Sequence, residues 1–184
     1  MIKKIITISL ILTMIFAFAA CQTEQNTEDE ATENSATQSA IAEFGTNPTV
    51  YAVVSNANPA IGEEITVAVK LCNAGLFSSI DLVADYDSNV LDVEYTSVGT
   101  IPDLVDTLKV DTGKISYGGF VMRSAEVTDE TLFELAVTPL PGAGGTQTIQ
   151  LSGINFLIAL DAEGNETADK TNLLQTENIV INVQ

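Results

Sequence analysis

The chain has 184 residues, with 25 acidic and 7 basic side chains, no histidine, and a net charge of -18. The lack of histidine excludes Ser-His-Asp and Cys-His catalysis and removes the commonest zinc ligand. The strongly negative charge argues against binding to nucleic acid or to anionic lipid headgroups, because both carry charge of the same sign.

The first twenty residues have the composition of a secretory signal. Lys3 and Lys4 precede an apolar run from Ile5 to Ala20, which is too short and too abruptly ended for a transmembrane helix. Small residues stand directly before Cys21, a pattern that resembles a bacterial lipobox. We therefore expect cleavage before Cys21, lipidation of its thiol, and attachment to the extracellular face of the cell membrane. Ordinary signal cleavage near Ala20, without a lipid, is the alternative.

Residues 21–43 are predicted to form a disordered acidic linker. They are mostly Gln, Thr, Glu, Asn, Ser and Ala, and they cannot bury enough apolar surface to offset the entropy of ordering. Removal of residues 1–20 takes away two lysines and no acid, so 25 acids would face 5 bases, a net charge of -20. Repulsion between the carboxylates would keep the linker extended. The remainder, residues 44–184, has the length of one domain.

Apolar and polar residues alternate with a period of two through residues 44–184. The positions predicted to face a core are Ile65, Val67, Val69, Leu71, Ile80, Leu82, Ala84, Tyr86, Leu91, Val93, Tyr95, Phe133, Leu135, Val137, Ile149, Leu151, Ile179, Ile181 and Val183. Such alternation is typical of half-buried antiparallel strands. Turn-forming residues separate the strands, and residues 100–110 and 124–130 are predicted to hold at most a helical turn. The sequence predicts an all-β fold, an antiparallel β-sandwich of about nine strands.

One acidic motif, Asp111-Thr112-Gly113, matches the catalytic loop of aspartic proteases. Those enzymes need two such carboxylates that share a proton, and this chain has a single copy. Asp, Thr and Gly also suit a tight turn between two strands. We therefore expect a hairpin here, and we expect no enzyme activity from one small domain without histidine or a recognisable catalytic motif.

A second acidic motif lies near the C-terminus, where Asp161, Glu163, Asn165 and Asp169 are spaced like calcium ligands. An EF-hand loop that began at Asp161 would need glycine at its sixth place, where Glu166 stands. We expect the tip of a hairpin loop here and no cofactor, with a looser surface calcium site as the alternative.

The order of several motifs resembles the cohesin family, the modules that bind dockerins in cellulosome-type assemblies. The pattern at 62–69 (GEEITVAV) looks like one of the family's opening strands. Residues 80–99 (IDLVADYDSNVLDVEYTSVG) look like its most distinctive stretch, in which a strand ends in Tyr-Asp, turns, and restarts with Val-Leu-Asp-Val. Residues 113–120 (GKISYGGF) and 131–156 (TLFELAVTPLPGAGGTQTIQLSGINF) follow in the family's order. The resemblance implies a nine-stranded jelly-roll sandwich, in which residues 87–89 shape a structural corner.

The resemblance also implies a partner-binding sheet face. In type I cohesins a small polar residue, and an aspartate two places later, contact the dockerin from the strand before Tyr-Asp; Ser79 and Asp81 match them. The residues expected on this face are Ser79, Asp81, Val83, Tyr117, Gly119 and Val121. Gly118 and Gly119 depart from the bulkier residues expected of the family and should flatten the face.

Together these features predict a non-catalytic, lipid-anchored surface module that binds a dockerin-containing protein and is linked to polysaccharide degradation. Two alternatives stay open. A carbohydrate-binding sandwich would need exposed aromatic residues, for which Tyr51, Tyr117 and Phe120 are the candidates. A structural or adhesive surface lipoprotein would have lost dockerin binding. The sequence also leaves open whether Cys72 is exposed and forms a disulfide-linked dimer.

Overall fold

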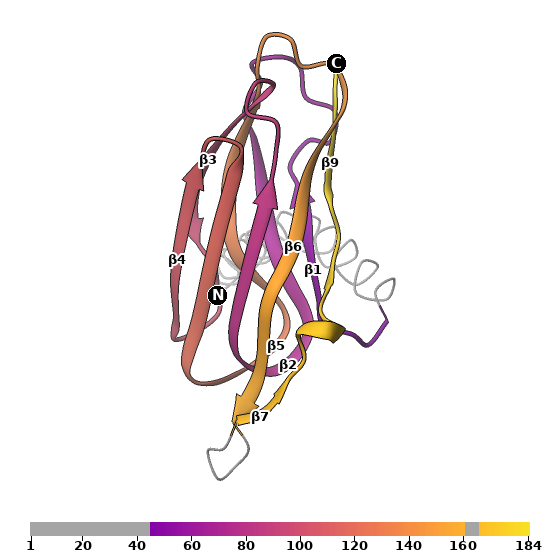
Figure 1. Cartoon of the computed structure of the whole chain (residues 1–184). Coiled ribbons are helices and arrows are strands. Elements are labelled where there is room, and N and C mark those ends of the chain that lie inside the picture. The colour runs from indigo at the N-terminus through magenta and orange to yellow at the C-terminus, as the bar shows by residue number, and fades with distance from the viewer. Residues whose placement is uncertain (1–44, 161–165) are drawn as a thin grey trace, which may run out of the picture. The chain divides into compact units, whose positions relative to one another are not determined.

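The computed structural model describes residues 45–160 and 166–184 (Figure 1). The predicted signal sequence, the predicted linker and Cys21 lie outside the described residues, as do the candidate calcium ligands Asp161, Glu163 and Asn165. The elements are β1 (Thr49–Val54), β2 (Ile65–Asp85), β3 (Leu91–Val98), β4 (Leu104–Asp111), β5 (Lys114–Pro139), β6 (Gly145–Leu160), β7 (Glu166–Asp169), the 3₁₀ turn η1 (Thr171–Leu173), β8 (Gln175–Thr176) and β9 (Ile179–Val183). Among the described residues, no helix has the length and apolar character needed to cross a membrane.

The all-β prediction is confirmed, and the two segments that the sequence allowed to hold at most a helical turn contain strand instead. The region 100–110 contains most of β4, and 124–130 lies inside β5. β4 pairs with the start of β5 across a tight hairpin, and residues 126–130 in the middle of β5 pair with β2. This pairing satisfies the backbone of both segments in the sheet and leaves no helical turn in either.

Two long strands, β2 and β5, join the two layers of the sandwich. They pair with each other antiparallel along most of their lengths. In one layer, residues 67–72 of β2 pair with β1, and residues 133–139 of β5 pair with β3. In the other layer, residues 77–85 of β2 pair with β6, and residues 114–121 of β5 pair with β4. The same two strands therefore form the centre of both layers, and Figure 1 shows them curving over at the lower end of the view.

The bend in β2 has a local cause. The pairing between β2 and β5 shifts register between Cys72 and Gly75 and again between Phe77 and Ser79. Asn73 and Gly75 in this stretch have positive φ values of 55° and 62°. Asparagine and glycine are the residues that adopt this conformation at least cost, and bulges of this kind bend a strand sharply.

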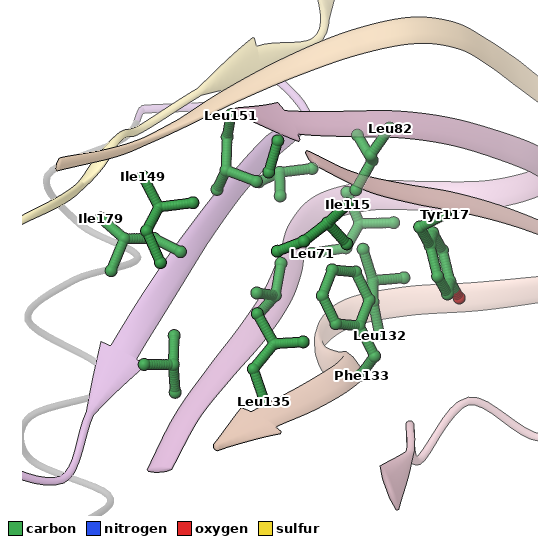
Figure 2. Close-up of a cluster of buried hydrophobic side chains, with 14 of the residues drawn as sticks. Leu71, Leu82, Ile115, Tyr117, Leu132, Phe133, Leu135, Ile149, Leu151 and Ile179 are labelled. Atoms are coloured by element: carbon green, nitrogen blue, oxygen red, sulfur yellow. The ribbon is translucent and has the colours of Figure 1, made fainter. Parts of the chain in front are cut away.

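The core lies between the layers and follows the predicted alternation closely. Residues 65, 67, 69 and 71 of β2 are buried, and so are 149 and 151 of β6 and 179, 181 and 183 of β9. Figure 2 shows part of this cluster. The rings of Phe77 and Phe156 stack within it at a centroid distance of 6.3 Å. Two predicted core positions are exceptions. Tyr95 lies on the edge strand β3 and is 42 % exposed, and Tyr86 is only partly buried against the core.

The acidic corner at residues 86–91 is structural. The Asp87 side chain accepts a hydrogen bond from the Asn89 backbone N–H at 2.9 Å, and its carbonyl accepts bonds from Val90 and Leu91 at 3.1 and 3.0 Å. The Tyr86 hydroxyl donates to the carbonyl oxygen of Asp111 at 3.0 Å. The Asp87 bonds close the turn between β2 and β3, as predicted, and the Tyr86 bond also joins this corner to the β4–β5 hairpin.

The Asp-Thr-Gly motif forms that hairpin. Asp111 ends β4 and pairs directly with Lys114 at the start of β5, which leaves Thr112 and Gly113 as the two-residue turn. Gly113 has a φ of 76°, and a β-carbon there would come within 3.1 Å of the Tyr86 carbonyl oxygen. The glycine is therefore required by both backbone conformation and space.

Candidate partner-binding face

In the layer that contains β4 and β6, the strands lie in the order β4, β5, β2 and β6. The outer surface of this layer is called here the β4–β5–β2–β6 face. Directly paired residues of antiparallel strands point to the same side of a sheet, so the register gives the rows of side chains across it. The rows are Val105, Phe120, Ser79 and Leu157; Thr107, Gly118, Asp81 and Asn155; Lys109, Ser116, Val83 and Ser152; and Asp111, Lys114, Asp85 and Gln150.

The prediction is wrong for three of the six residues expected on this face, because the structure has them on the opposite side of the sheet. Tyr117, Gly119 and Val121 are buried on the inner face, where the Tyr117 ring packs beside Phe133 with centroids 4.7 Å apart (Figure 2). The observed register pairs Asp81 with Gly118, so the even-numbered residues of β5 point outward. Ser79, Asp81 and Val83 lie on the outer face, as predicted, and their role in binding stays a prediction.

Chemical character changes from one end of the face to the other. At one end, Phe120 is 50 % exposed and its cross-strand neighbour Val105 is 47 % exposed. At the other end, the Lys109 ammonium lies 2.6 Å from the Asp111 carboxylate, and both side chains are exposed to solvent. Asp81 lies between the two ends, in the row next to Phe120. The face therefore offers an apolar contact and a carboxylate side by side.

Sequence reasoning did not single out Phe120 as an anchor, although a signal for it was present. Ile115, Tyr117 and Val121 are apolar at odd-numbered positions of β5, which predicts that the odd positions face the core. Phe120 then falls on the outer face as an apolar residue without a core role. The paired glycines interrupt this alternation and obscure the phase of the strand.

Tyr117 shows why Gly119 must be glycine. A β-carbon at Gly119 would lie 2.9 Å from the Tyr117 hydroxyl oxygen and 3.2 Å from a ring carbon. The hydroxyl itself is buried and has no hydrogen-bond partner within the part of the chain that the structure describes. Burial, reinforced by the nearby negative charge of Asp106, raises the pKa of Tyr117, so the group stays neutral at physiological pH.

Removing the Tyr117 hydroxyl should not destabilise the domain. We expect Tyr117→Phe to leave the melting temperature unchanged or raise it, because a buried hydroxyl without a protein partner costs free energy. Tyr51→Phe is the matched control, since the Tyr51 hydroxyl donates a 2.7 Å hydrogen bond to Asp129. The control should lose about 1.5–3 kcal/mol, the usual value of a hydrogen bond to a charged group. Calorimetry of both variants would contradict the assignment if Tyr117→Phe were the more damaging change.

Cys72 is buried, which answers the question that the sequence left open. Burial, reinforced by the negative charge of Asp129, raises the pKa of the Cys72 thiol from 9.0 to about 11. We expect the native protein to resist alkylation at pH 8 and to form no disulfide-linked dimer, because the thiolate is the reactive species. Mass spectrometry after alkylation, with and without urea, tests this expectation.

The same pKa shift predicts a pH dependence of stability. A group whose pKa is raised by folding contributes stability that is complete below its unfolded pKa and is lost as pH rises through its folded pKa. Cys72 therefore contributes a fall in the free energy of unfolding between about pH 9 and pH 11. Urea denaturation across this range should show the fall, and Cys72→Ala should reduce it.

No set of three or more cysteine, aspartate or glutamate side chains that could hold a metal ion is present among the residues the structure describes. Of the four candidate calcium ligands, Asp169 is the one among the described residues, and it accepts a 2.9 Å hydrogen bond from the backbone N–H of Thr171. That bond gives Asp169 a structural role at the start of η1.

Known proteins match this chain in structure but not in the comparisons made by sequence. No family model matches the sequence, and no curated protein matches it either. A non-cellulosomal cohesin from the hyperthermophilic archaeon Archaeoglobus fulgidus aligns with a TM-score of 0.58 and 24 % identity, over 75 % of this chain and 91 % of that one. The seventh ScaB type I cohesin from Pseudobacteroides cellulosolvens aligns with a TM-score of 0.56 and 19 % identity, over 74 % and 92 %. The domain has the cohesin fold.

A third matching structure contains a bound partner. It is the Coh-OlpA–Doc918 complex, described as a type I cohesin–dockerin complex from Clostridium thermocellum, with a TM-score of 0.52, 18 % identity, and coverage of 74 % of this chain and 99 % of that one. The likeness of the present chain to all three structures is one of fold. The alignments cover 91 %, 92 % and 99 % of the three matched structures.

Proposed function

We propose that the cohesin-fold domain is a non-catalytic module that binds a dockerin-containing protein through its β4–β5–β2–β6 face. The proposal rests mainly on one observation, the exposed pair Phe120 and Val105 beside Asp81 on a regular sheet face. An aromatic anchor next to a polar group, surrounded by smaller side chains, is the usual arrangement of a protein-binding hot spot. A dockerin partner is supported by the fold and by the matching cohesin–dockerin complex.

The charge of the domain supports a partner with a basic surface. Residues 45–184 contain 19 acidic and 5 basic side chains, a net charge of -14. A field of this sign speeds the approach of a positively charged partner and disfavours acidic competitors. The effect weakens as salt is added, because exposed charges are screened beyond about 8 Å at physiological ionic strength.

The proposal extends to the cell surface. Lipidation of Cys21 would hold the protein on the extracellular face of the membrane, and residues 21–43 would act as the tether between the lipid and the domain. The partner would then be retained near the cell, where an enzyme that degrades polysaccharides can act on nearby substrate. Metabolic labelling with a lipid analogue, compared between wild type and Cys21→Ala, tests this part separately.

A pull-down tests the binding function. The protein, with residues 1–21 replaced by an affinity tag, is incubated with secreted and surface proteins of the source organism, with calcium and with a chelator. Calcium-dependent capture of a protein that carries paired EF-hand-like loops is the expected result. Retention on insoluble polysaccharide without protein capture would instead favour a carbohydrate-binding module. Failure in both assays would contradict the proposal.

The alternative of a carbohydrate-binding module gains no support from the candidate aromatic residues. Tyr51 and Tyr117 are buried, and only Phe120 of the three is exposed. Tyr95 is exposed as well, but it belongs to β3 in the other layer. Within the described residues, these two exposed rings do not form a row on one face, which is the arrangement that stacking on a sugar chain requires.

A further inference from the structure

Asp81 occupies the centre of the β4–β5–β2–β6 face, with a neighbouring strand on each side. On one side it pairs directly with Asn155 of β6, whose side-chain amide donates a hydrogen bond to Asp81 Oδ2 at 3.3 Å. On the other side it pairs with Gly118 of β5. The two neighbours therefore act on different oxygen atoms of one carboxylate.

Gly118 provides the space in which the other oxygen lies. A β-carbon at residue 118 would stand 3.0 Å from Asp81 Oδ1, which is closer than ordinary van der Waals contact. The backbone of Gly118 does not have a positive φ, so conformation alone would allow alanine at this position. The close approach of the Asp81 carboxylate is the constraint that favours glycine.

We propose that Gly118 and Asn155 are positioning residues that hold the Asp81 carboxylate across the sheet, with Oδ1 presented to the partner as a hydrogen-bond acceptor. Asn155 holds Oδ2, and none of the described residues donates a hydrogen bond to Oδ1. Because residue 118 has no side chain, a partner atom can reach Oδ1 from above β5. The inference rests on the proposed dockerin binding and adds the chemistry of the contact.

The chemistry of the bound side chain follows from this geometry. The partner group over Asp81 must be a hydrogen-bond donor, such as a hydroxyl, an amide or a cationic side chain, since an ionised carboxylate only accepts. One row away, Phe120 and Val105 offer an apolar surface. The partner surface that meets this face should therefore carry a hydrogen-bond donor and an apolar side chain next to each other.

The test compares two glycine-to-alanine variants. Gly118→Ala should weaken the affinity for the captured dockerin protein roughly tenfold, the value of one displaced charge-assisted hydrogen bond. Gly144→Ala is the matched control, because a β-carbon at residue 144 meets nothing within 4 Å. Both variants are first checked for an unchanged melting temperature. A crystal structure of free Gly118→Ala should also show the Asp81 carboxylate moved away from residue 118.

A double-mutant cycle separates positioning from a general disturbance of the sheet. In the Asp81→Ala background, Gly118→Ala should have no further effect on affinity, because its effect acts through the carboxylate. Asn155→Ala should behave in the same way. An equal loss in both backgrounds, or wild-type affinity of Gly118→Ala, would overturn the inference while dockerin binding by the wild type still stood. Failure of the wild type to capture a dockerin protein would overturn both proposals.

Discussion

Replacing Phe120 with alanine should weaken dockerin binding at least roughly 30-fold, equivalent to about 2 kcal/mol, the level that defines a binding hot spot. Phe120 is half exposed in the free domain and lies in the row next to Asp81. Truncation removes the largest apolar contact on the face and leaves Val105 as the remaining anchor. Isothermal titration of wild type and variant against the captured partner measures the loss.

Matched variants in the other layer distinguish a local contact from a general effect. Tyr95 is an aromatic residue of similar exposure on β3, so Tyr95→Ala should leave affinity unchanged. Val105→Ser and Val98→Ser form a second pair, since both valines are exposed on edge strands of different layers. We expect only Val105→Ser to weaken binding. Equal losses at Phe120 and Tyr95 would show that the partner does not use the β4–β5–β2–β6 face.

The layers and most of the core could be predicted because alternation is a local signal. A buried residue at 65 makes burial at 67, 69 and 71 a consequence of the strand's period, whatever the strand pairs with. Turn residues are local in the same sense, and the corner at 87–89 and the hairpin at 111–114 are formed as their composition predicts. These parts of the fold require no knowledge of distant contacts.

The composition of the binding face depends on register, which is not local. Whether Asp81 has Gly118 or Gly119 beside it is decided by pairing between strands more than thirty residues apart, and a shift of one residue exchanges the two faces. The two adjacent glycines leave space on opposite sides of the sheet. Gly119 leaves space for the Tyr117 ring, and Gly118 leaves space for the Asp81 carboxylate. The sequence shows only that both positions lack side chains.

In the layer that contains β1 and β3, the burial of two residues also depends on contacts between strands that the sequence does not show. Cys72 and Tyr51 fall on the side of their strands opposite the core, where alternation predicts exposure, yet both are buried. They lie beside an ion pair between Lys70 of β2 and Asp129 of β5, whose ammonium nitrogen and carboxylate oxygen are 2.8 Å apart. The Tyr51 hydroxyl donates to the second carboxylate oxygen. Such a cluster forms only once three strands have assembled.

Removing Asp129 should therefore be among the most damaging single substitutions in the domain. The side chains of Lys70 and Asp129 are only 15 % and 10 % exposed. Asp129→Ala leaves an ammonium group without its counter-charge and a tyrosine hydroxyl without its acceptor, which should lower the free energy of unfolding by about 3–5 kcal/mol. Urea denaturation at pH 7 measures the change.

An exposed ion pair in the same protein provides the control. Lys109 and Asp111 approach to 2.6 Å, but their side chains are 72 % and 52 % exposed, so Asp111→Ala should cost less than about 1 kcal/mol. The double variant Lys70→Met/Asp129→Leu should recover much of the stability that Asp129→Ala loses, because it removes both buried charges together. If Asp129→Ala cost no more than Asp111→Ala, the Lys70–Asp129 pair would have to be hydrated in solution. Recovery in the double variant would show that the penalty comes from the unpaired lysine, rather than from the loss of attraction within the pair.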